Sequence, residues 1–264
     1  MRIAFLTNKT AILSMPVFEK LAHSERIDLA HTFFYDTLSE GRKSPASIIT
    51  QLGLRRVVIK VLELVGSGLR RRLGKLLGPT AIRARSPYDL AVIGDLPHST
   101  ISDLNHPETI AFVRGLNVDV VLVCVCKNIL RRELLSLPNL KWVNVHPSLL
   151  PQYRGPTPTF WMLYHGERQT GVTFHLMTPK IDDGEILAQL SMPLDCSKSE
   201  AQIETEVFKL AATVVEDVLE NLDSGLVEVP SPTEHHPSSY YSFPTPTQRR
   251  ELYRRLKSRP MMNA

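Results

Sequence analysis

The chain has 264 residues, 43% of them hydrophobic and 22% charged, and a formal net charge of +4. This apolar fraction excludes an intrinsically disordered chain. The longest unbroken apolar run, residues 120–126, is much shorter than the roughly twenty residues of a membrane span, and residues 1–10 contain no stretch typical of a secretory signal. Three cysteines do not suit a disulfide scaffold, so the sequence predicts a globular protein of the reducing cytoplasm.

The first third of the chain alternates between apolar patterns typical of strands and of helices. The elements expected there are a strand at residues 2–7, a helix at 11–22, a strand at 27–35 and a loop at 36–50. Residues 51–77 then carry apolar side chains every three or four positions, which predicts an amphipathic helix. The run Gly66-Ser67-Gly68 is expected to break this helix in two.

The segment 51–77 holds the chain's excess positive charge. Seven basic residues stand against the single acid Glu63, a net charge of +6, so the rest of the chain is slightly acidic. A surface basic enough for general nucleic-acid binding is therefore not indicated, and a nucleic-acid partner is disfavoured. Three interpretations of the segment stay open: a helix packed on the core with a solvated basic face, a contact with a membrane surface or lipid-linked substrate, or a contact with a partner such as an acidic carrier protein.

The remaining two thirds of the chain return to alternating strands and helices. We expect a weak strand or loop at residues 89–93, a helix at 107–116, a central strand at 119–126, a helix at 130–137, a strand at 141–145, a helix at 157–165, strands at 172–177 and 186–192, and a long helix at 200–222. This order predicts an α/β fold with a Rossmann-like, mostly parallel sheet and helices on both faces.

The last part of the chain has a different composition. It is Pro-rich from residue 230 and basic from residue 248. We therefore expect a catalytic domain at 1–225, followed by a short C-terminal extension at 226–264 made of an extended arm and a helix rich in arginine and lysine.

Two polar segments follow predicted strands, where open α/β sheets carry their sites. Asn144 and His146 are two residues apart on a strand, so they share a face. An Asn amide can donate to the oxyanion formed when a carbonyl is attacked, and a His can take the amine proton. Asp182, in a later loop, could orient the imidazole and stabilise its charged form. Taken alone, the first two could equally be a packed polar pair and the third a turn residue.

The spacing of several motifs makes the functional interpretation specific. The residues Asn144-x-His146-Pro147-Ser148-Leu149-Leu150-Pro151, Gly155, Thr170-Gly171-Val172-Thr173 and Ile181-Asp182-x-Gly184 together resemble the signature of the formyltransferases that use N10-formyltetrahydrofolate. The resemblance covers residues 1–225 and implies a formyltransferase-type fold. It also implies that Asn144, His146 and Asp182 form the catalytic set, with no metal.

The same resemblance implies where the folate would bind. In the family the pterin lies between the loop after the central strand and the loop with the catalytic Asp, held mostly by backbone hydrogen bonds. The first loop corresponds to Cys126, Lys127, Asn128, Ile129 and Leu130, and the second to Thr178, Pro179, Lys180 and Ile181. His175, just before the second loop, could be a further donor or a packed core histidine.

The amine acceptor is less constrained by the resemblance. Methionyl-tRNA formyltransferases add a C-terminal barrel domain, glycinamide ribonucleotide enzymes have a Gly-containing phosphate loop where this chain has residues 7–10, and formyltetrahydrofolate hydrolases add an N-terminal domain. The chain resembles the short formyltransferases instead, so an amino sugar nucleotide is the leading acceptor, and Arg154 could bind its phosphate or simply be solvated. The alternatives are an amino acid derivative or aminoacyl carrier, a methionyl-tRNA formyltransferase-like or hydrolase activity, and a folate-binding protein without turnover.

Other features do not indicate a second cofactor. Cys124 and Cys126 share a strand face, but without a further Cys or His pair at zinc spacing they are expected to be small core residues. A dinucleotide cofactor is not supported, because Gly66-Ser67-Gly68 lies in a helical pattern and no Gly-x-Gly-x-x-Gly run follows a strand. A homodimer stays open.

Overall fold

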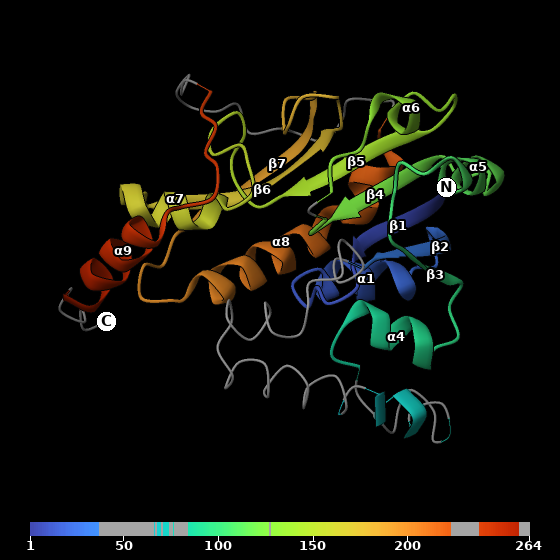
Figure 1. Ribbon diagram of the computed structural model, residues 1–264, viewed down its shortest axis with the longest axis horizontal. Coiled ribbons are helices and arrows are strands. Elements are labelled where there is room, and N and C mark those ends of the chain that lie inside the picture. Colours follow the sequence, from blue (N-terminus) through green and yellow to red (C-terminus); the bar gives the residue numbers. More distant parts are fainter. Residues whose placement is uncertain are drawn as a thin grey trace, which may run out of the picture.

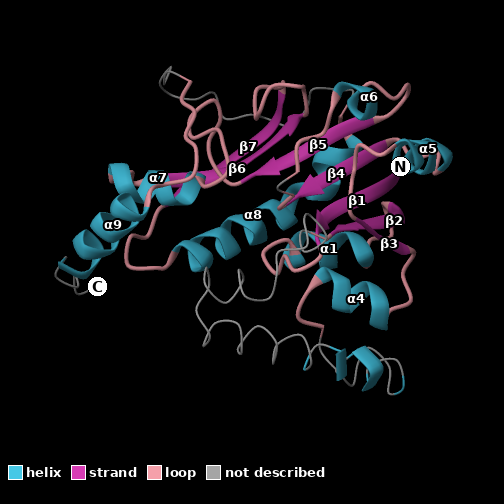
Figure 2. Ribbon diagram, viewed as in Figure 1, coloured by secondary structure: helices cyan, strands magenta, loops and turns pink. Residues whose placement is uncertain are grey.

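The computed structural model describes residues 1–36, 84–126, 128–222 and 238–258, together with positions 66, 68, 69, 71–73 and 76. Its centre is a seven-stranded sheet in the order β3-β2-β1-β4-β5-β6-β7. The strands are β1 (Arg2–Asn8), β2 (Asp28–Tyr35), β3 (His98–Ile101), β4 (Val120–Cys124), β5 (Lys141–His146), β6 (Gln169–Leu176) and β7 (Ile186–Pro193). All pairs from β3 to β5 are parallel, whereas β6 and β7 are antiparallel to their neighbours, so the predicted mostly parallel α/β sheet is confirmed (Figures 1 and 2).

Helices cover both faces of this sheet. They are α1 (Met15–Ala22), α4 (Pro87–Ile93), α5 (Pro107–Gly115), α6 (Arg132–Leu135), α7 (Pro158–His165), α8 (Glu200–Glu220) and α9 (Pro246–Ser258). Buried side chains of α1, α4, α7 and α8 share one hydrophobic cluster with the sheet, and those of α5 and α6 share a second cluster on the opposite face.

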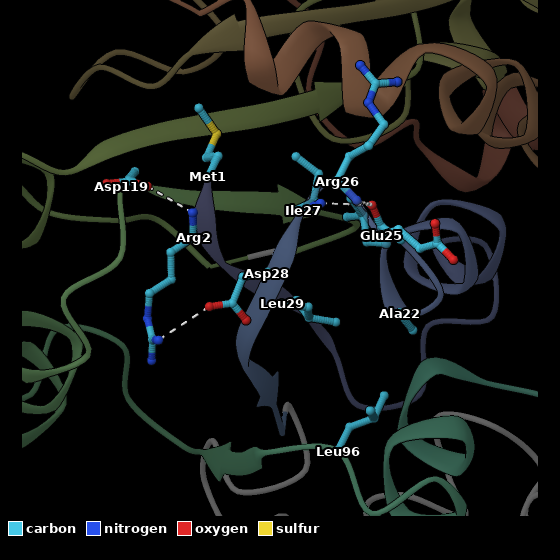
Figure 3. Close-up of a pocket in the computed structure, with 12 residues that line it drawn as sticks. Met1, Arg2, Ala22, Glu25, Arg26, Ile27, Asp28, Leu29, Leu96 and Asp119 are labelled. Carbon is cyan, nitrogen blue, oxygen red and sulfur yellow. Dashed lines mark hydrogen bonds and ion pairs between the residues drawn. The ribbon is translucent and has the colours of Figure 1, made fainter.

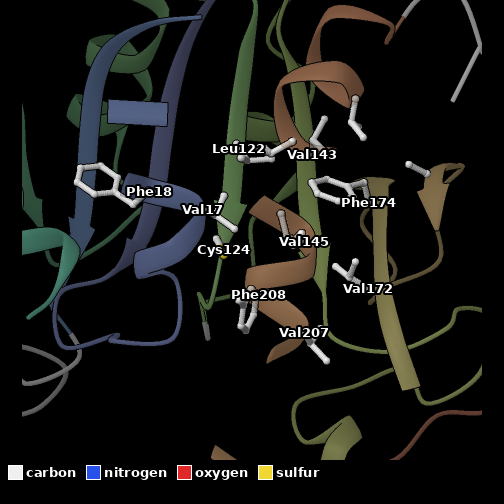
Figure 4. Packing of buried hydrophobic residues seen from close by; sticks show 14 of the residues in the cluster. Val17, Phe18, Leu122, Cys124, Val143, Val145, Val172, Phe174, Val207 and Phe208 are labelled. Atoms are coloured by element: carbon white, nitrogen blue, oxygen red, sulfur yellow. The ribbon is translucent and has the colours of Figure 1, made fainter. Parts of the chain in front are cut away.

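The larger cluster is built from the apolar faces of α8 and the central strands. Val207 and Phe208 of α8 pack with Val145 of β5 and Phe174 of β6 (Figure 4). A capping box begins α8: the Ser199 side chain accepts from the backbone N–H of Gln202, whose side chain accepts from the Ser199 N–H. Because β4 is buried at all five positions, it is the central two-sided strand that its β-branched sequence predicts.

Two elements differ from the sequence predictions. The weak strand or loop expected at 89–93 is wrong, because this stretch belongs to helix α4, which begins with Ser86 as N-cap and Pro87 in its first turn. Edge strand β3 was not predicted, since the strand has only four residues, most of them polar, and pairs only with β2. Of the expected helix 51–77 only positions 66–76 fall partly within the described residues, and those are helical.

The described part of the predicted C-terminal extension packs on the helices that cover the sheet. Leu252 of α9 is buried in the larger cluster, and the Tyr164 hydroxyl of α7 donates to Glu251 at 2.7 Å. Tyr253 of α9 donates to Glu200 at the start of α8. The extension therefore lies along α7 and the start of α8 (Figure 1).

The strand order reverses between β1 and β4, because the chain adds strands on one side of β1 and then returns to its other side. In open α/β sheets a ligand binds in the crevice beyond the carboxyl ends of the strands at such a point. The loop after β4 begins there, and its Val125 carbonyl accepts from the Asn8 N–H that ends β1.

Candidate active site

The carboxyl half of β5 carries the predicted Asn144 and His146. In the sheet Asn144 lies opposite His175 of β6, and His146 lies opposite Thr173. His146 is only 4% exposed, while Asn144 is half-buried. Alternation along the strand places both side chains on one face, as the sequence predicts.

The ring of His146 is held in one orientation by a backbone carbonyl. Its Nε2 lies 3.0 Å from the Tyr153 carbonyl oxygen. A carbonyl can only accept, so Nε2 carries the hydrogen in the neutral ring and Nδ1 is left with a lone pair. That Nδ1 lies 3.7 Å from Oδ2 of Asp182, too far for a direct hydrogen bond but close enough for the carboxylate to stabilise an imidazolium.

His175 orients the amide of Asn144. Its Nδ1 donates to the Leu176 carbonyl at 2.9 Å, so its Nε2 has no hydrogen in the neutral ring. The Asn144 Nδ2 lies 3.1 Å from that nitrogen and donates a hydrogen bond to it, since the amide oxygen has no hydrogen to donate. Burial, together with the neighbouring His146, lowers the pKa of His175 and favours this neutral form. The sequence left open a donor or a packed histidine; in the structure His175 is the acceptor that orients Asn144.

Asp182 lies between the two imidazoles. Its Oδ1 is 3.7 Å from Nε2 of His175, and its Oδ2 is the oxygen that faces His146. The Gly155 N–H donates to Oδ2 at 2.8 Å and so fixes the carboxylate. Because β6 is antiparallel, it ends beside Val143, and the following loop must return along the sheet to bring Asp182 to this position.

Arg154 clamps the Asp182 loop from the other side. Its Nε and Nη2 donate to the Ile181 carbonyl at 2.9 and 2.6 Å, and its Nη1 lies 2.8 Å from Oδ1 of Asp183. The guanidinium is therefore engaged within the protein. The sequence-based suggestion that Arg154 binds an acceptor phosphate is not supported by these contacts.

The C-terminal segment holds the loop that contains Arg154. The Arg154 N–H donates to the Ser239 carbonyl at 3.0 Å, and its carbonyl accepts from the Tyr241 N–H at 2.9 Å. The Tyr241 ring stacks on Trp161 and Tyr153, with ring centroids 4.9 and 5.5 Å apart. Gly155 has φ of +110°, and a Cβ there would lie 2.1 Å from the Tyr241 carbonyl oxygen, so only glycine fits.

A buried polar network supports the loop after β5 from below. The Thr173 hydroxyl donates to the Ser148 carbonyl at 2.6 Å and accepts from the Leu150 N–H. Gln189 of β7 donates to the Leu150 carbonyl and to the same hydroxyl. This network explains the Thr at position 173 in the sequence motif, whose role sequence spacing alone did not indicate.

The two predicted folate loops leave the strands on either side of β5. In the first, Ile129 is 62% exposed, Asn128 and Cys126 are half-buried, Leu130 is buried, and Lys127 lies outside the described residues. Asn105 holds this loop by donating to the Ile129 carbonyl at 3.0 Å. Burial raises the pKa of Cys126 to about 11, so it is a thiol near neutral pH.

In the second folate loop the predicted residues are exposed. Thr178, Pro179 and Lys180 are exposed, and Ile181 is 40% exposed. The Thr178 hydroxyl accepts from the Lys180 N–H and shapes the turn. Each loop thus offers one isoleucine to solvent, and Leu130 is directed into the core instead.

The cavity seen in Figure 3 lies at the opposite, amino end of the strands. It has a volume of about 660 Å³ and is lined by Arg2, Arg26, Asp28 and Asp119 among others. Inside it Arg2 contacts Asp28 at 3.3 Å, and the Arg2 backbone N–H donates to Asp119 at 2.8 Å. None of the predicted site residues lines it. Among the described residues no group of three or more metal-ligating side chains is found.

Comparison with known proteins identifies the family of this chain. The sequence pattern of a family described as "Formyl transferase" matches residues 80–219. The methionyl-tRNA formyltransferase of Roseiflexus sp. is 38% identical over 140 residues, which are 53% of this chain and 43% of that protein. The chain spans less than half of that relative's length.

Solved structures show the same fold at low sequence identity. A sugar N-formyltransferase from Shewanella sp. superposes with a TM-score of 0.56 at 18% identity, over 92% of this chain and 77% of that one. HypX from Aquifex aeolicus in complex with tetrahydrofolic acid gives a TM-score of 0.54 at 17% identity, over 94% of this chain and 31% of that one. The family pattern spans more than half of the chain, and the chain therefore belongs to the formyl transferase family.

Proposed function

We propose that this protein transfers the formyl group of N10-formyltetrahydrofolate to the amine of an acceptor. The observation that carries the proposal is the position of the Asp182 carboxylate, 3.7 Å from each of two buried imidazoles, beside an Asn144 amide oriented by one of them. Family membership supports the same reaction class.

The chain's own residues account for the needs of acyl transfer. The folate supplies an electrophilic formyl carbon. When the amine attacks it, a carbon–nitrogen bond forms, and one Nδ2 hydrogen of Asn144 remains to donate to the developing oxyanion. The proton released by the amine passes to Nδ1 of His146, with Asp182 stabilising the imidazolium. The bond to the folate nitrogen then breaks as that nitrogen receives the proton, so charge is balanced.

The two flanking loops fit a bound pterin. Ile129 and Ile181 are both partly exposed, and burying them against a flat heterocycle removes apolar surface from water. The Asn8 Oδ1 is buried without a hydrogen-bond partner at the end of β1, next to the first loop. The complex of HypX with tetrahydrofolic acid supports this ligand class.

For the acceptor we propose an amino sugar nucleotide. The fold likeness to a sugar N-formyltransferase extends over 92% of this chain. The named activity of the curated relatives makes methionyl-tRNA the second candidate, and an aminoacyl carrier the third. All three present a primary amine, which is the chemistry that Asn144 and His146 would serve.

The deciding experiment follows the absorbance change as tetrahydrofolate is released. The full chain is incubated with the formyl donor and a panel containing amino sugar nucleotides, methionyl-tRNA and an aminoacyl carrier. Release that requires an amino sugar nucleotide supports the proposal in full. Release without any amine would identify a hydrolase, and folate binding without release would identify a non-catalytic folate-binding protein.

A further inference from the structure

The described positions between Gly66 and Leu76 form a helix that exposes its apolar side. Leu69, Leu73 and Leu76 are 59%, 40% and 80% exposed, and they lie four and three residues apart. At about 100° per residue these leucines fall within roughly 60° of one face. We call these described positions the basic helix. It lies below α4 and away from the sheet (Figure 1).

The polar side of the basic helix faces the protein instead. Arg71, on the face opposite the leucines, places its Nη1 3.1 Å from Oδ1 of Asp89 on α4, whose side chain is only 4% exposed. Its guanidinium also lies over the Tyr88 ring, 5.1 Å from the ring centroid. These two contacts hold the Arg71 side of the helix against α4, so the leucines on the opposite side face away from the protein. The interpretation of a helix packed on the core by its apolar face is therefore wrong at these positions.

The charge around the leucines has one sign. Beside the described Arg71 and Arg72, the sequence carries Arg70 and Lys75 in the same stretch. No acidic residue occurs between Glu63 and Asp89. Among the described helices none is long and apolar enough to cross a bilayer.

We propose that the basic helix is a docking surface for an anionic lipid membrane and lies in the plane of the interface. An apolar stripe in a segment rich in arginine and lysine is typical of interfacial helices, whose leucines enter the acyl boundary while the cations reach the phosphates. Each basic side chain near such a surface adds to the attraction. An anionic bilayer presents both the negative charge and the apolar layer that this combination requires.

The position of the segment relates docking to the active site. The chain leaves the sheet after Tyr35, at the carboxyl end of β2, and the basic helix is fastened to α4 through Arg71. The loop after β4 begins at the same edge of the parallel sheet. Docking would therefore bring the edge that carries the folate loop toward the lipid surface.

Vesicle sedimentation of the full chain tests this proposal without any use of enzymatic activity. We expect binding to vesicles of phosphatidylglycerol and phosphatidylcholine, weakened at least tenfold at high salt, and little binding to phosphatidylcholine alone. The triple variant Leu69→Ser/Leu73→Ser/Leu76→Ser should lose at least tenfold in affinity. The matched control is Ile12→Ser/Phe243→Ser, which removes two other exposed apolar side chains (65% and 61%) and should bind as the unsubstituted protein does.

Thermal unfolding by circular dichroism shows whether each variant is folded. Because all the substituted side chains are exposed, both variants should unfold near the temperature of the unsubstituted protein. No binding to anionic vesicles, or equal binding by the leucine variant, would overturn the proposal. Binding to an acidic carrier protein but not to vesicles would also overturn it, in favour of a protein partner. Since formyl transfer is assayed separately, either proposal can fail while the other stands.

Discussion

The strand pair β5–β6 and the basic helix have opposite arrangements of polar and apolar groups. At β5–β6 the polar side chains turn inward: His146 and His175 are 4% and 2% exposed, and each ring nitrogen has a polar neighbour. On the basic helix the arrangement is reversed: Arg71 contacts Asp89 of α4, while the leucines are exposed to solvent. Transfer chemistry needs groups held in fixed orientations, which only burial and hydrogen bonds supply. A docking surface needs apolar groups that are still solvated before the partner arrives.

The largest effects should come from the proposed catalytic residues of this strand pair and the loop that follows it. We expect Asn144→Ala, His146→Ala and Asp182→Ala each to lower turnover by about 10²–10³-fold or more, because each removes a donor or charge that acts on the transition state. Folate affinity, measured by titration, should change far less, since the pterin is expected to bind mainly to backbone. Combined variants should lose little beyond the worst single variant, because the three act as a unit. Near-normal amine-dependent turnover in His146→Ala would contradict the mechanism.

The difference in burial also predicts which side-chain truncation lowers the free energy of unfolding. Phe208→Ala should lower the free energy of unfolding by about 3–5 kcal/mol, because Phe208 is 2% exposed and packs in the larger cluster. Leu73→Ala should change it by less than about 0.5 kcal/mol, since Leu73 is 40% exposed. Urea denaturation of both variants measures the difference. Equal destabilisation by the two substitutions would mean that Leu73 is buried in the folded protein. It would contradict the difference in burial between α8 and the basic helix.

A third prediction concerns the C-terminal segment as a support of the strand pair. Tyr241→Ala removes the stacking on Trp161 and Tyr153 beside the loop that fixes Asp182 through Gly155. We expect turnover to fall by about tenfold, as for loss of orientation without loss of a reacting group, with folate affinity unchanged.

The matched control for that prediction is Phe243→Ala, because Phe243 is a neighbouring aromatic residue that is 61% exposed. It should leave turnover unchanged. If the Tyr241 variant kept full turnover while folded, the segment would be no more than a surface attachment.

The buried His175 makes the strand pair sensitive to acid. Burial is the main cause of its lowered pKa, with His146 and Arg154 acting in the same direction and Asp182 against it. The unfolded chain therefore binds a proton near pH 6.5 that the folded protein does not bind. Stability should be unaffected by this group above that pH and should fall as the pH drops from there to the lowered pKa.

The measurement for this prediction is urea denaturation at neutral pH and at about two units lower. His175→Gln should reduce the loss of stability on acidification, whereas substitution of the exposed His23 should not. Turnover of the unsubstituted protein should also fall in acid, because a proton on Nε2 displaces the Asn144 amide. An unchanged acid dependence in His175→Gln would show that the folded and the unfolded protein bind a proton at this residue equally, which would contradict the prediction.

The sequence predicted the strand that carries Asn144 and His146 but did not predict the orientation of the basic helix. Asn144 and His146 share a face because strands alternate strictly, and Asp182, which the motif resemblance pointed to, lies 3.7 Å from His146. Periodicity could not distinguish α8 from the basic helix, since both carry apolar residues every three or four positions but only α8 buries them. Which side a helix turns inward depends on distant partners such as Asp89.

Contacts between distant segments set the other limit of prediction. The Gly155 N–H, the Tyr153 carbonyl and the Arg154 clamp act through backbone atoms or through loops whose path depends on the whole fold. Arg154 looked like a free cation because the sequence could not reveal that Ile181 and Asp183 would meet its guanidinium. Helix α4 was missed for a different reason. Its Ser86-Pro87 start is present in the sequence, but the apolar pattern that follows is too short to indicate a helix.

The smallest effect is expected at Cys124, which lies at the end of β4 just before the first folate loop. Its thiol is fully buried, and burial raises its pKa far above neutrality, so no thiolate is available for nucleophilic chemistry. Cys124→Ala should therefore leave turnover within about twofold and cost less than about 1.5 kcal/mol of stability, as a small, nearly shape-preserving change does. Turnover and urea denaturation of this variant measure both quantities. The proposed transfer through Asn144, His146 and Asp182 needs no covalent enzyme intermediate, so a folded Cys124→Ala variant without activity would require a different mechanism.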